Sequence, residues 1–202
     1  MRLLSWHGVN TQKLIGVKMG NSWIFRNRAN LVVVLAVIFG IIWMIDGSFK
    51  FMPGTADTVV QSIQSAGQSL PALAPWFSLW YGMAIQNPIF WVELIGTLEI
   101  LLGIALVLGF MKKTTYVLGM VLSLFIWAVP EAFGGPYGSG STDIGTGIIY
   151  AIVFAALILI NAGYGPSRLS VDYCLEKRVS WWRKVAEFSP AGSAKGKTQK
   201  QH

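Results

Sequence analysis

Four long apolar stretches alternate with more polar segments along the chain. They cover about residues 30–51, 88–110, 114–133 and 143–164. A helix rises about 1.5 Å per residue and a bilayer core is about 30 Å thick, so about 20 apolar residues are enough to cross it. The pattern therefore predicts an all-α integral membrane protein whose residues 30–165 form a four-helix transmembrane bundle.

The second apolar stretch, residues 88–110, contains two charged residues, Glu93 and Glu99. An ionisable side chain in a bilayer costs about 2.5–3.5 kcal/mol on insertion scales, so it marks a candidate functional site. At about 100° per residue, Glu93, Gly96, Glu99 and Gly103 share one arc of the helix. The glycines would let another helix or a flat ligand approach closely. The alternative is that both carboxyl groups only form hydrogen bonds between helices.

The longest connection, residues 52–87, contains Asp57 as its one charged residue. Val60 and Ile63 lie at helical spacing in it, and Thr55 or Asp57 is a suitable N-cap. So long a segment with so little charge is expected to fold onto the membrane. The pattern predicts an extracytoplasmic amphipathic segment.

Both ends of the chain are basic. Residues 1–29 contain five basic residues and no acid, and are predicted to be a cytoplasmic leader. Residues 166–188 mix basic and apolar positions and are predicted to form an amphipathic helix on the cytoplasmic membrane face. Residues 189–202 are predicted to be a disordered basic tail. Of the 16 Lys and Arg residues, Lys50 alone lies on the other side, so the positive-inside rule predicts cytoplasmic termini and a multi-pass plasma-membrane protein.

Composition supports the membrane interpretation and narrows the chemistry. The chain is 53% hydrophobic and 12% charged, whereas soluble proteins average about 25% charged residues. One cysteine excludes a disulfide within the chain, and the two histidines stand near its ends, at positions 7 and 202. Haem, zinc and cysteine-ligated clusters are therefore not expected. Motifs for phosphate, dinucleotide or nucleic-acid binding are not found in the sequence.

The predicted orientation gathers acidic residues near the outer side of the bundle. Five of the nine acids belong to this group: Asp46, Glu93, Glu99, Glu131 and Asp143. Three tryptophans are predicted at similar depth: Trp43, Trp91 and Trp127. Helix ends tolerate polar groups, so chance is one explanation. Three helices that each bring a carboxylate close to a tryptophan instead favour the mouth of a binding site.

Two segments resemble a known family. The second span, PIFWVELIGTLEILLGIALVLGF, and residues 131–154, EAFGGPYGSGSTDIGTGIIYAIVF, resemble the DoxX-like membrane family, and most of all the DoxD-type subunit of thiosulfate:quinone oxidoreductase. The resemblance covers about residues 30–165. It implies electron transfer from thiosulfate, which becomes tetrathionate, to a membrane quinone. It also implies a DoxA-type partner, expected here as a separate subunit.

The resemblance implies roles for the candidate residues. Quinone reduction needs an apolar slot and proton donors beside the ring carbonyls. Proton-transferring catalytic residues would be Glu99, Glu93, Glu131 and Asp143. Quinone-binding residues would be Trp43, Trp91, Trp127, Gly96 and Gly103. Quinone is the one cofactor expected on this chain, and haem, flavin and metal are not expected.

Thiosulfate is a dianion, which makes cationic and amide groups on the outer side relevant. Lys50 is the one basic residue there, and Asp46 lies four residues earlier, at a spacing that allows an ion pair. The backbone amides of Gly145 and Gly147, at the start of the fourth span, are further candidates. The partner subunit is another possible source of an anion site. The substrate-binding prediction is therefore Lys50, Asp46, Gly145 and Gly147.

Two other function classes stay open. One is an accessory structural subunit of a respiratory quinol oxidase complex, in which the carboxyl groups support packing alone. The other is a small DoxX-type transporter with Glu99 as its gate, although four spans need oligomers to enclose a pathway. All three classes require a lipid bilayer, and none involves nucleic acid. The charge-poor outer connections suggest an acidophile.

Overall fold

The computed structural model describes residues 23–135, 137, 143–164, 169–186 and 188. Every regular element within these ranges is helical. The elements are α1 (Trp23–Phe49), α2 (Thr55–Ser69), η3 (Pro71–Leu73), α3 (Ala74–Ala84), α4 (Pro88–Leu108), α5 (Lys112–Ala128), η4 (Ala132–Gly134), α6 (Thr146–Tyr164), α7 (Val171–Leu175) and α8 (Arg183–Ala186). The predicted tail, residues 189–202, and most of the predicted leader lie outside the described residues.

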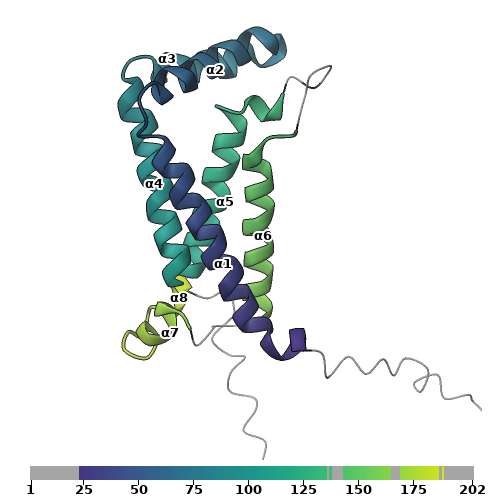
Figure 1. Cartoon of the computed structure of the whole chain (residues 1–202), viewed down its shortest axis with the longest axis vertical. Helices are drawn as coiled ribbons and strands as arrows, with labels where there is room; N and C mark the ends of the chain where they lie inside the picture. Colours follow the sequence, from purple (N-terminus) through teal and green to yellow (C-terminus); the bar gives the residue numbers. More distant parts are fainter. Residues whose placement is uncertain (1–22, 136, 138–142, 165–168, 187, 189–202) are drawn as a thin grey trace, which may run out of the picture.

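Four helices, α1, α4, α5 and α6, run side by side along the molecule (Figure 1). Helices α2 and α3 lie across one end of this bundle, and α7 and α8 lie at the other end. Two helices contain stretches long and apolar enough to cross a membrane, Asn30–Phe49 in α1 and Pro88–Leu108 in α4. In α6, Thr146–Ala162 is a shorter apolar segment.

The first two predicted spans need small corrections at their ends. Helix α1 begins at Trp23, so it includes the end of the predicted leader, and it stops at Phe49 rather than residue 51. Helix α4 starts at Pro88 as the pattern predicts and ends at Leu108. Gly109 follows with φ 60°, a left-handed conformation that glycine adopts easily and that commonly ends a helix.

The third and fourth predicted spans are shorter than expected. Helix α5 ends at Ala128 because Pro130 has no N–H to continue the helix and restricts the residue before it. Helix α6 begins at Thr146 rather than residue 143. Asp143 does not cap it; the Oδ1 atom of Asp143 accepts a hydrogen bond from the Gly145 N–H at 2.7 Å, in the turn before the helix.

Helices α1 and α4 pack closely through glycines. A Cβ atom added to Gly96 would lie 2.7 Å from the Cβ of Lys50 and 2.8 Å from the Gly47 carbonyl oxygen. A Cβ atom added to Gly103 would lie 2.5 Å from the Gly40 carbonyl oxygen. Both glycines, which are predicted to bind a quinone, lie against α1 in the structure. Their small size lets another helix, α1, approach closely, which is one of the two alternatives that the sequence suggested.

An aromatic core joins α1 to α6. Trp43 is 1% exposed and Phe154 is fully buried. Their ring centroids lie 5.6 Å apart, and those of Trp43 and Tyr150 also lie 5.6 Å apart. Gly119 of α5 packs directly against the Phe154 ring. This core fixes how α6 is rotated against α1, and so which of its side chains face the inside of the bundle.

The connection over residues 52–87 folds as an amphipathic helix, α2, followed by α3. Val60 and Ile63 of α2 are buried, as the pattern predicts, and Ile63 packs in one hydrophobic cluster with Phe77 of α3. The expected N-cap at Thr55 or Asp57 is wrong. Gly54 holds that position with φ 81° and without a side-chain hydrogen bond.

The predicted single amphipathic helix over residues 166–188 is wrong. The described part of this segment forms two short helices, α7 and α8, and Asp172 lies in α7. Its buried carboxylate accepts hydrogen bonds from Met111 N–H at 2.8 Å, Lys112 N–H at 3.0 Å and Trp182 Nε1–H at 2.9 Å. The first two donors belong to the start of α5, so Asp172 caps that helix from 60 residues away in sequence.

Candidate functional site

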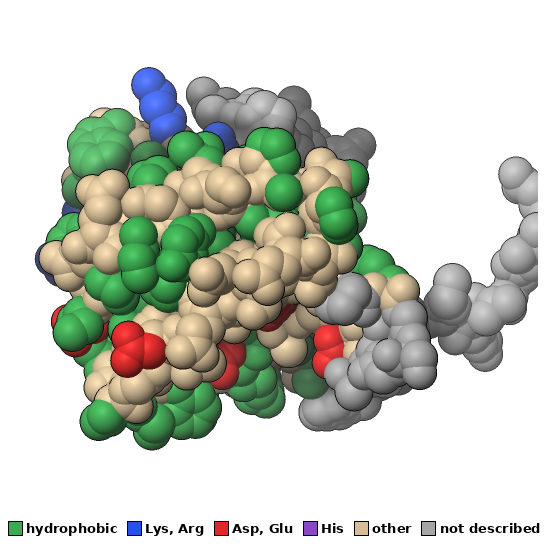
Figure 2. Space-filling model, turned by 90° about the horizontal axis from the view of Figure 1, so that it is seen from above, with side chains coloured by type: hydrophobic (Ala, Val, Ile, Leu, Met, Phe, Trp, Pro, Cys, Tyr) green, Lys and Arg blue, Asp and Glu red, His purple; other side chains and the backbone are tan. Residues whose placement is uncertain are grey.

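Two adjoining cavities lie near the α2–α3 end of the bundle. One is polar, with a volume of about 200 Å³, and receives side chains from α1, α4, α5 and α6. The other is mostly apolar, with a volume of about 280 Å³, and lies between α4, α5 and the α2–α3 layer. Lys50, Ile126 and Glu131 line both. Seen from the α2–α3 end, acidic side chains are visible between neighbouring segments (Figure 2).

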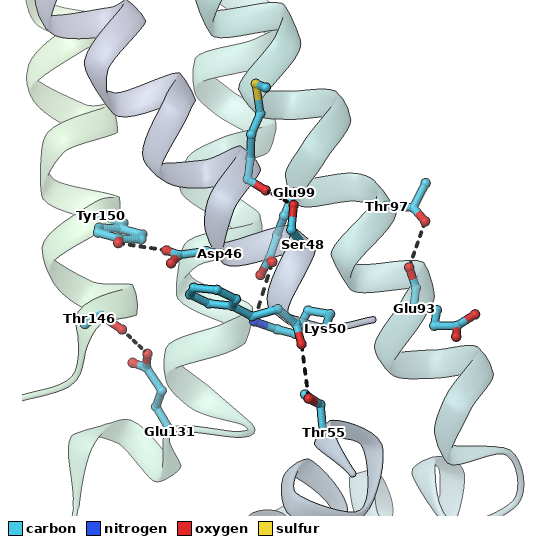
Figure 3. Close-up of polar contacts among 12 residues, drawn as sticks. Asp46, Ser48, Lys50, Thr55, Glu93, Thr97, Glu99, Glu131, Thr146 and Tyr150 are labelled. Atoms are coloured by element: carbon cyan, nitrogen blue, oxygen red, sulfur yellow. Dashed lines mark hydrogen bonds and ion pairs between the residues drawn. The ribbon is translucent and has the colours of Figure 1, made fainter. Parts of the chain in front are cut away.

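Glu99 forms the buried floor of the polar cavity. It is 2% exposed, and its Oε2 atom lies 3.5 Å from the Nζ atom of Lys50. The expected pair between Asp46 and Lys50 is replaced by two other contacts (Figure 3). Lys50 lies beyond the end of α1, so the helical spacing of four residues does not apply. Asp46 instead accepts a 2.8 Å hydrogen bond from the Tyr150 hydroxyl of α6.

Glu131 is positioned by a turn with unusual backbone angles. Ala132 and Phe133 have φ values of 51° and 58°, in the left-handed region that side chains other than glycine rarely adopt. This turn brings the Glu131 carboxylate to the start of α6. There it accepts hydrogen bonds from the Thr146 hydroxyl and, at 2.9 Å, from the Gly147 N–H. Such strain is often found at functional sites.

The backbone amides that the sequence suggested for anion binding are therefore already in use. The Gly147 N–H donates to Glu131, and the Gly145 N–H donates to Asp143. The two amides predicted to bind an anion thus each have a carboxylate of the chain itself as acceptor. Asp143 is exposed, and its hydrogen bond holds a turn, so its predicted place among the proton-transferring residues is not supported.

Glu93 does not join the cluster. It is exposed and points away from Lys50 and Glu99, beside Thr97 on the same helix (Figure 3). Glu93 and Glu99 are six residues apart, which places them at opposite edges of their shared helical arc. Since α1 covers the glycines between them, only one edge faces the cavity, and that edge carries Glu99.

The three predicted tryptophans have three different positions. Trp43 lines the polar cavity, and its buried Nε1 has no hydrogen-bond partner within the described part of the chain. Trp91 is 37% exposed and lines the apolar cavity. Trp127 donates its Nε1–H to the Ile144 carbonyl oxygen at 2.8 Å, so it supports the turn before α6. Trp127 is not among the residues that line either of these two cavities.

Aromatic side chains form part of the wall of the apolar cavity. Trp80 of α3 packs edge-on against Phe125 of α5, with ring centroids 4.9 Å apart and an angle of 76° between the planes. Both rings line the cavity together with Trp91. Lys50 and Glu131 form the polar edge of the apolar cavity, and both residues also line the polar cavity. An apolar ligand here would therefore approach two ionisable groups.

Charge limits what the polar cavity can bind. Three carboxyl groups line it, from Asp46, Glu99 and Glu131, and Lys50 is the one basic residue among the lining residues. A cavity with three acidic residues and one basic residue does not favour a dianion, whereas carboxyl groups can exchange protons with a neutral ligand. Among the residues that the structure describes, no group of three or more His, Cys, Asp or Glu is placed to hold a metal ion.

Several lining residues were missed from the sequence. They are Ser123, Thr146 and Tyr150 in the polar cavity and Trp80 and Phe125 in the apolar one. Tyr150 did give a signal, because its hydroxyl is a polar group within an apolar span, as Glu99 is. Comparison of the chain with family models, with curated proteins and with solved structures gave no match.

Proposed function

We propose that this chain is the quinone-binding membrane subunit of a thiosulfate:quinone oxidoreductase of the DoxX-like family. The observation that carries the proposal is the junction of the two cavities. An apolar cavity with aromatic walls meets, at Lys50 and Glu131, a polar cavity that contains the buried Glu99. A quinone needs these two surroundings together, an apolar slot for its ring and proton donors at its carbonyl oxygens.

The proposal includes four membrane spans, α1, α4, α5 and α6. Their side-by-side arrangement supports it, together with the length and apolar character of α1 and α4 (Figure 1). Basic residues concentrate before and within the first turns of α1, at the start of α5 and after α6, which supports cytoplasmic termini in a plasma-membrane protein. In this orientation the α2–α3 layer and both cavities lie near the outer face.

The chemistry balances with the quinone as electron acceptor. Two thiosulfate ions joined as tetrathionate release two electrons, and the bound quinone takes up two electrons and two protons to become a quinol. Glu99 donates a proton from the cavity floor. Lys50, 3.5 Å away, positions the Glu99 carboxyl group, and Glu131 returns a proton to it from the end of the cavity near the α2–α3 layer.

Thiosulfate itself is bound elsewhere in this proposal. The polar cavity has one basic residue, Lys50, beside three acidic ones, and the amides at the start of α6 already have acceptors. A DoxA-type partner subunit is therefore the proposed thiosulfate-binding component. The chain alone is expected to reduce no quinone with thiosulfate.

The test is thiosulfate-dependent reduction of a short-tail benzoquinone by the purified chain, with and without its partner. Activity that requires both subunits is the expected result. Stoichiometric purification with haem-containing oxidase subunits, without this activity, would replace the proposal with an accessory structural role. Full turnover by the chain alone would contradict the assignment of thiosulfate binding to the partner.

A further inference from the structure

An apolar groove with a volume of about 590 Å³ lies between α4 and α5. It reaches from Ile95 and Phe125 to Phe110 and Thr114, at the end of the bundle near α7 and α8. Ile95 and Phe125 also line the apolar cavity described above, so the groove and that cavity adjoin at these two side chains. In the proposed orientation, the groove extends from the cavity toward the cytoplasmic face.

The groove is open because the bundle consists of two closely packed helix pairs. Gly103 of α4 packs against the backbone of α1, and Gly119 of α5 packs against the Phe154 ring of α6. Helices α4 and α5 pack less closely against each other. Leu98 on one wall and Leu118 on the other are therefore exposed, and the groove is accessible along one side.

The two walls of the groove have the same spacing. The row on α4 consists of Ile95, Leu98, Leu102 and Ala105, which recur every three or four residues and so share one helix face. The row on α5 runs at the same spacing from Phe125 to Thr115. Each row extends over about 15 Å of helix axis, since a helix rises about 1.5 Å per residue. The groove can therefore hold an extended chain.

The lining of the groove favours a pure hydrocarbon. Among the described residues that line it, Thr114 and Thr115 are the polar ones. The Thr115 hydroxyl donates to the Phe110 carbonyl oxygen at 2.8 Å, and the Thr114 hydroxyl donates to the Val185 carbonyl oxygen at 3.3 Å. Both hydroxyl protons are already used within the protein. A bilayer offers hydrocarbon to any such surface, so the adjoining apolar cavity has to indicate which hydrocarbon binds here.

We propose that the groove binds the hydrocarbon tail of a lipid-soluble quinone whose ring lies in the apolar cavity. That cavity, at about 280 Å³, is at the small end of ligand sites, which commonly measure about 300–1,000 Å³. It suits a ring better than a ring with a long tail, so the tail has to leave it. The groove that adjoins it at Ile95 and Phe125 is an apolar path for this tail. The inference rests on the proposed function for the identity of the ring, and deepens it by adding a tail-binding site.

The direct test uses a decyl-benzoquinone with a photoreactive diazirine at the end of its tail. The probe is added to the purified full chain in phosphatidylcholine nanodiscs, without thiosulfate or partner, and the labelled peptides are identified by mass spectrometry. Duroquinone, which has a quinone ring and no tail, is the competitor. Labelling should concentrate on residues 102–118. Duroquinone at about ten times its dissociation constant should reduce it by about 10-fold, because the tail lies in the groove only while its ring is bound.

A second measurement fills the groove with a larger side chain. Leu118→Trp adds volume on the α5 wall, and Leu124→Trp makes the same change at an exposed leucine of the same helix outside the groove lining. Leu118→Trp should weaken binding of decyl-benzoquinone by about 10-fold and leave that of duroquinone unchanged, because the tail alone meets the new ring. Leu124→Trp should change neither. The thermal midpoint of each variant is measured, and Leu98→Trp on the α4 wall repeats the test if Leu118→Trp does not fold.

Several results would overturn the inference. Labelling that duroquinone does not reduce would show that any bilayer hydrocarbon covers the groove. Unchanged decyl-benzoquinone affinity in both groove variants, or an equal loss for both quinones, would show that the groove does not hold the tail. Labelling that duroquinone reduces, without thiosulfate-dependent turnover once a partner is added, would refute the proposed function and keep the inference. Absence of any quinone binding to the wild type would refute both.

Discussion

Replacing Glu99 with Gln tests the proposed proton donor with little change in shape. Gln keeps the size and the hydrogen-bonding capacity of the side chain but has no acidic proton. Loss of a general acid lowers rates by about 10²–10⁴-fold. We expect about 10²-fold, or about 2.7 kcal/mol in activation free energy, because Lys50 and Glu131 remain to transfer protons in the same cavity.

The same substitution has a calculable effect on stability. It removes one partner of the ion pair with Lys50, whose side chain is 25% exposed, whereas that of Glu99 is 3% exposed. Removing one partner of a fully buried pair costs about 3–5 kcal/mol, and an exposed pair contributes about 0–1 kcal/mol. Because water reaches Lys50, we expect a loss of about 1–2 kcal/mol, and the variant should still fold.

Glu93→Gln is the matched control, since it makes the same chemical change on the same helix outside the cavity. The assay is thiosulfate-dependent reduction of decyl-benzoquinone by the chain with its partner, with the thermal midpoint measured in parallel. Glu93→Gln should keep wild-type turnover. If Glu99→Gln stays within about twofold of Glu93→Gln across the pH range, Glu99 is not the proton donor. A packing role would then predict that Glu99→Leu reduces assembly.

Three further predictions concern the fold and the topology. Asp172→Ala should lower the free energy of unfolding by about 3 kcal/mol, measured by denaturation in detergent, because three donors lose a buried carboxylate; an unchanged midpoint would contradict the capping role. Gly103→Ala should lower the thermal midpoint by the equivalent of about 1–3 kcal/mol, since its Cβ would meet the α1 backbone, whereas Gly82→Ala, with open space around it, should not. A cysteine at position 137, where Tyr137 is 61% exposed, should react with an impermeant reagent in intact cells, and Cys174 should not; the reverse labelling would overturn the proposed orientation.

Features that depend on local sequence could be predicted. The hydropathy of the apolar stretches and the helical spacing in residues 52–87 predict most of the helices. A carboxylate in the middle of an apolar helix marks Glu99 without any structure. Pro130 also gives a local signal for the end of α5, although the apolar character of the residues around it extended the predicted span to residue 133.

Features that depend on how the helices are rotated against each other could not be predicted. The helical arc of α4 contains Glu93 and Glu99, but only the packing of α1 decides which of them faces the cavity. Trp127 and Asp143 carry the right chemistry at the right depth, yet both hold the turn before α6. Asp172 was missed because its partners at the start of α5 lie 60 residues away in sequence.

The capping of α6 by Glu131 bears on which subunit binds the quinone and which binds thiosulfate. The start of a helix usually attracts anions, and the sequence suggested that thiosulfate would bind there. In the structure the chain's own carboxylate takes that place, bonded to Thr146 and Gly147. A second anion would have to displace Glu131 and then approach Asp46 and Glu99 in the same cavity. A neutral quinone in the adjoining apolar cavity meets no such barrier, which is why the proposal assigns the quinone to this chain and thiosulfate to its partner.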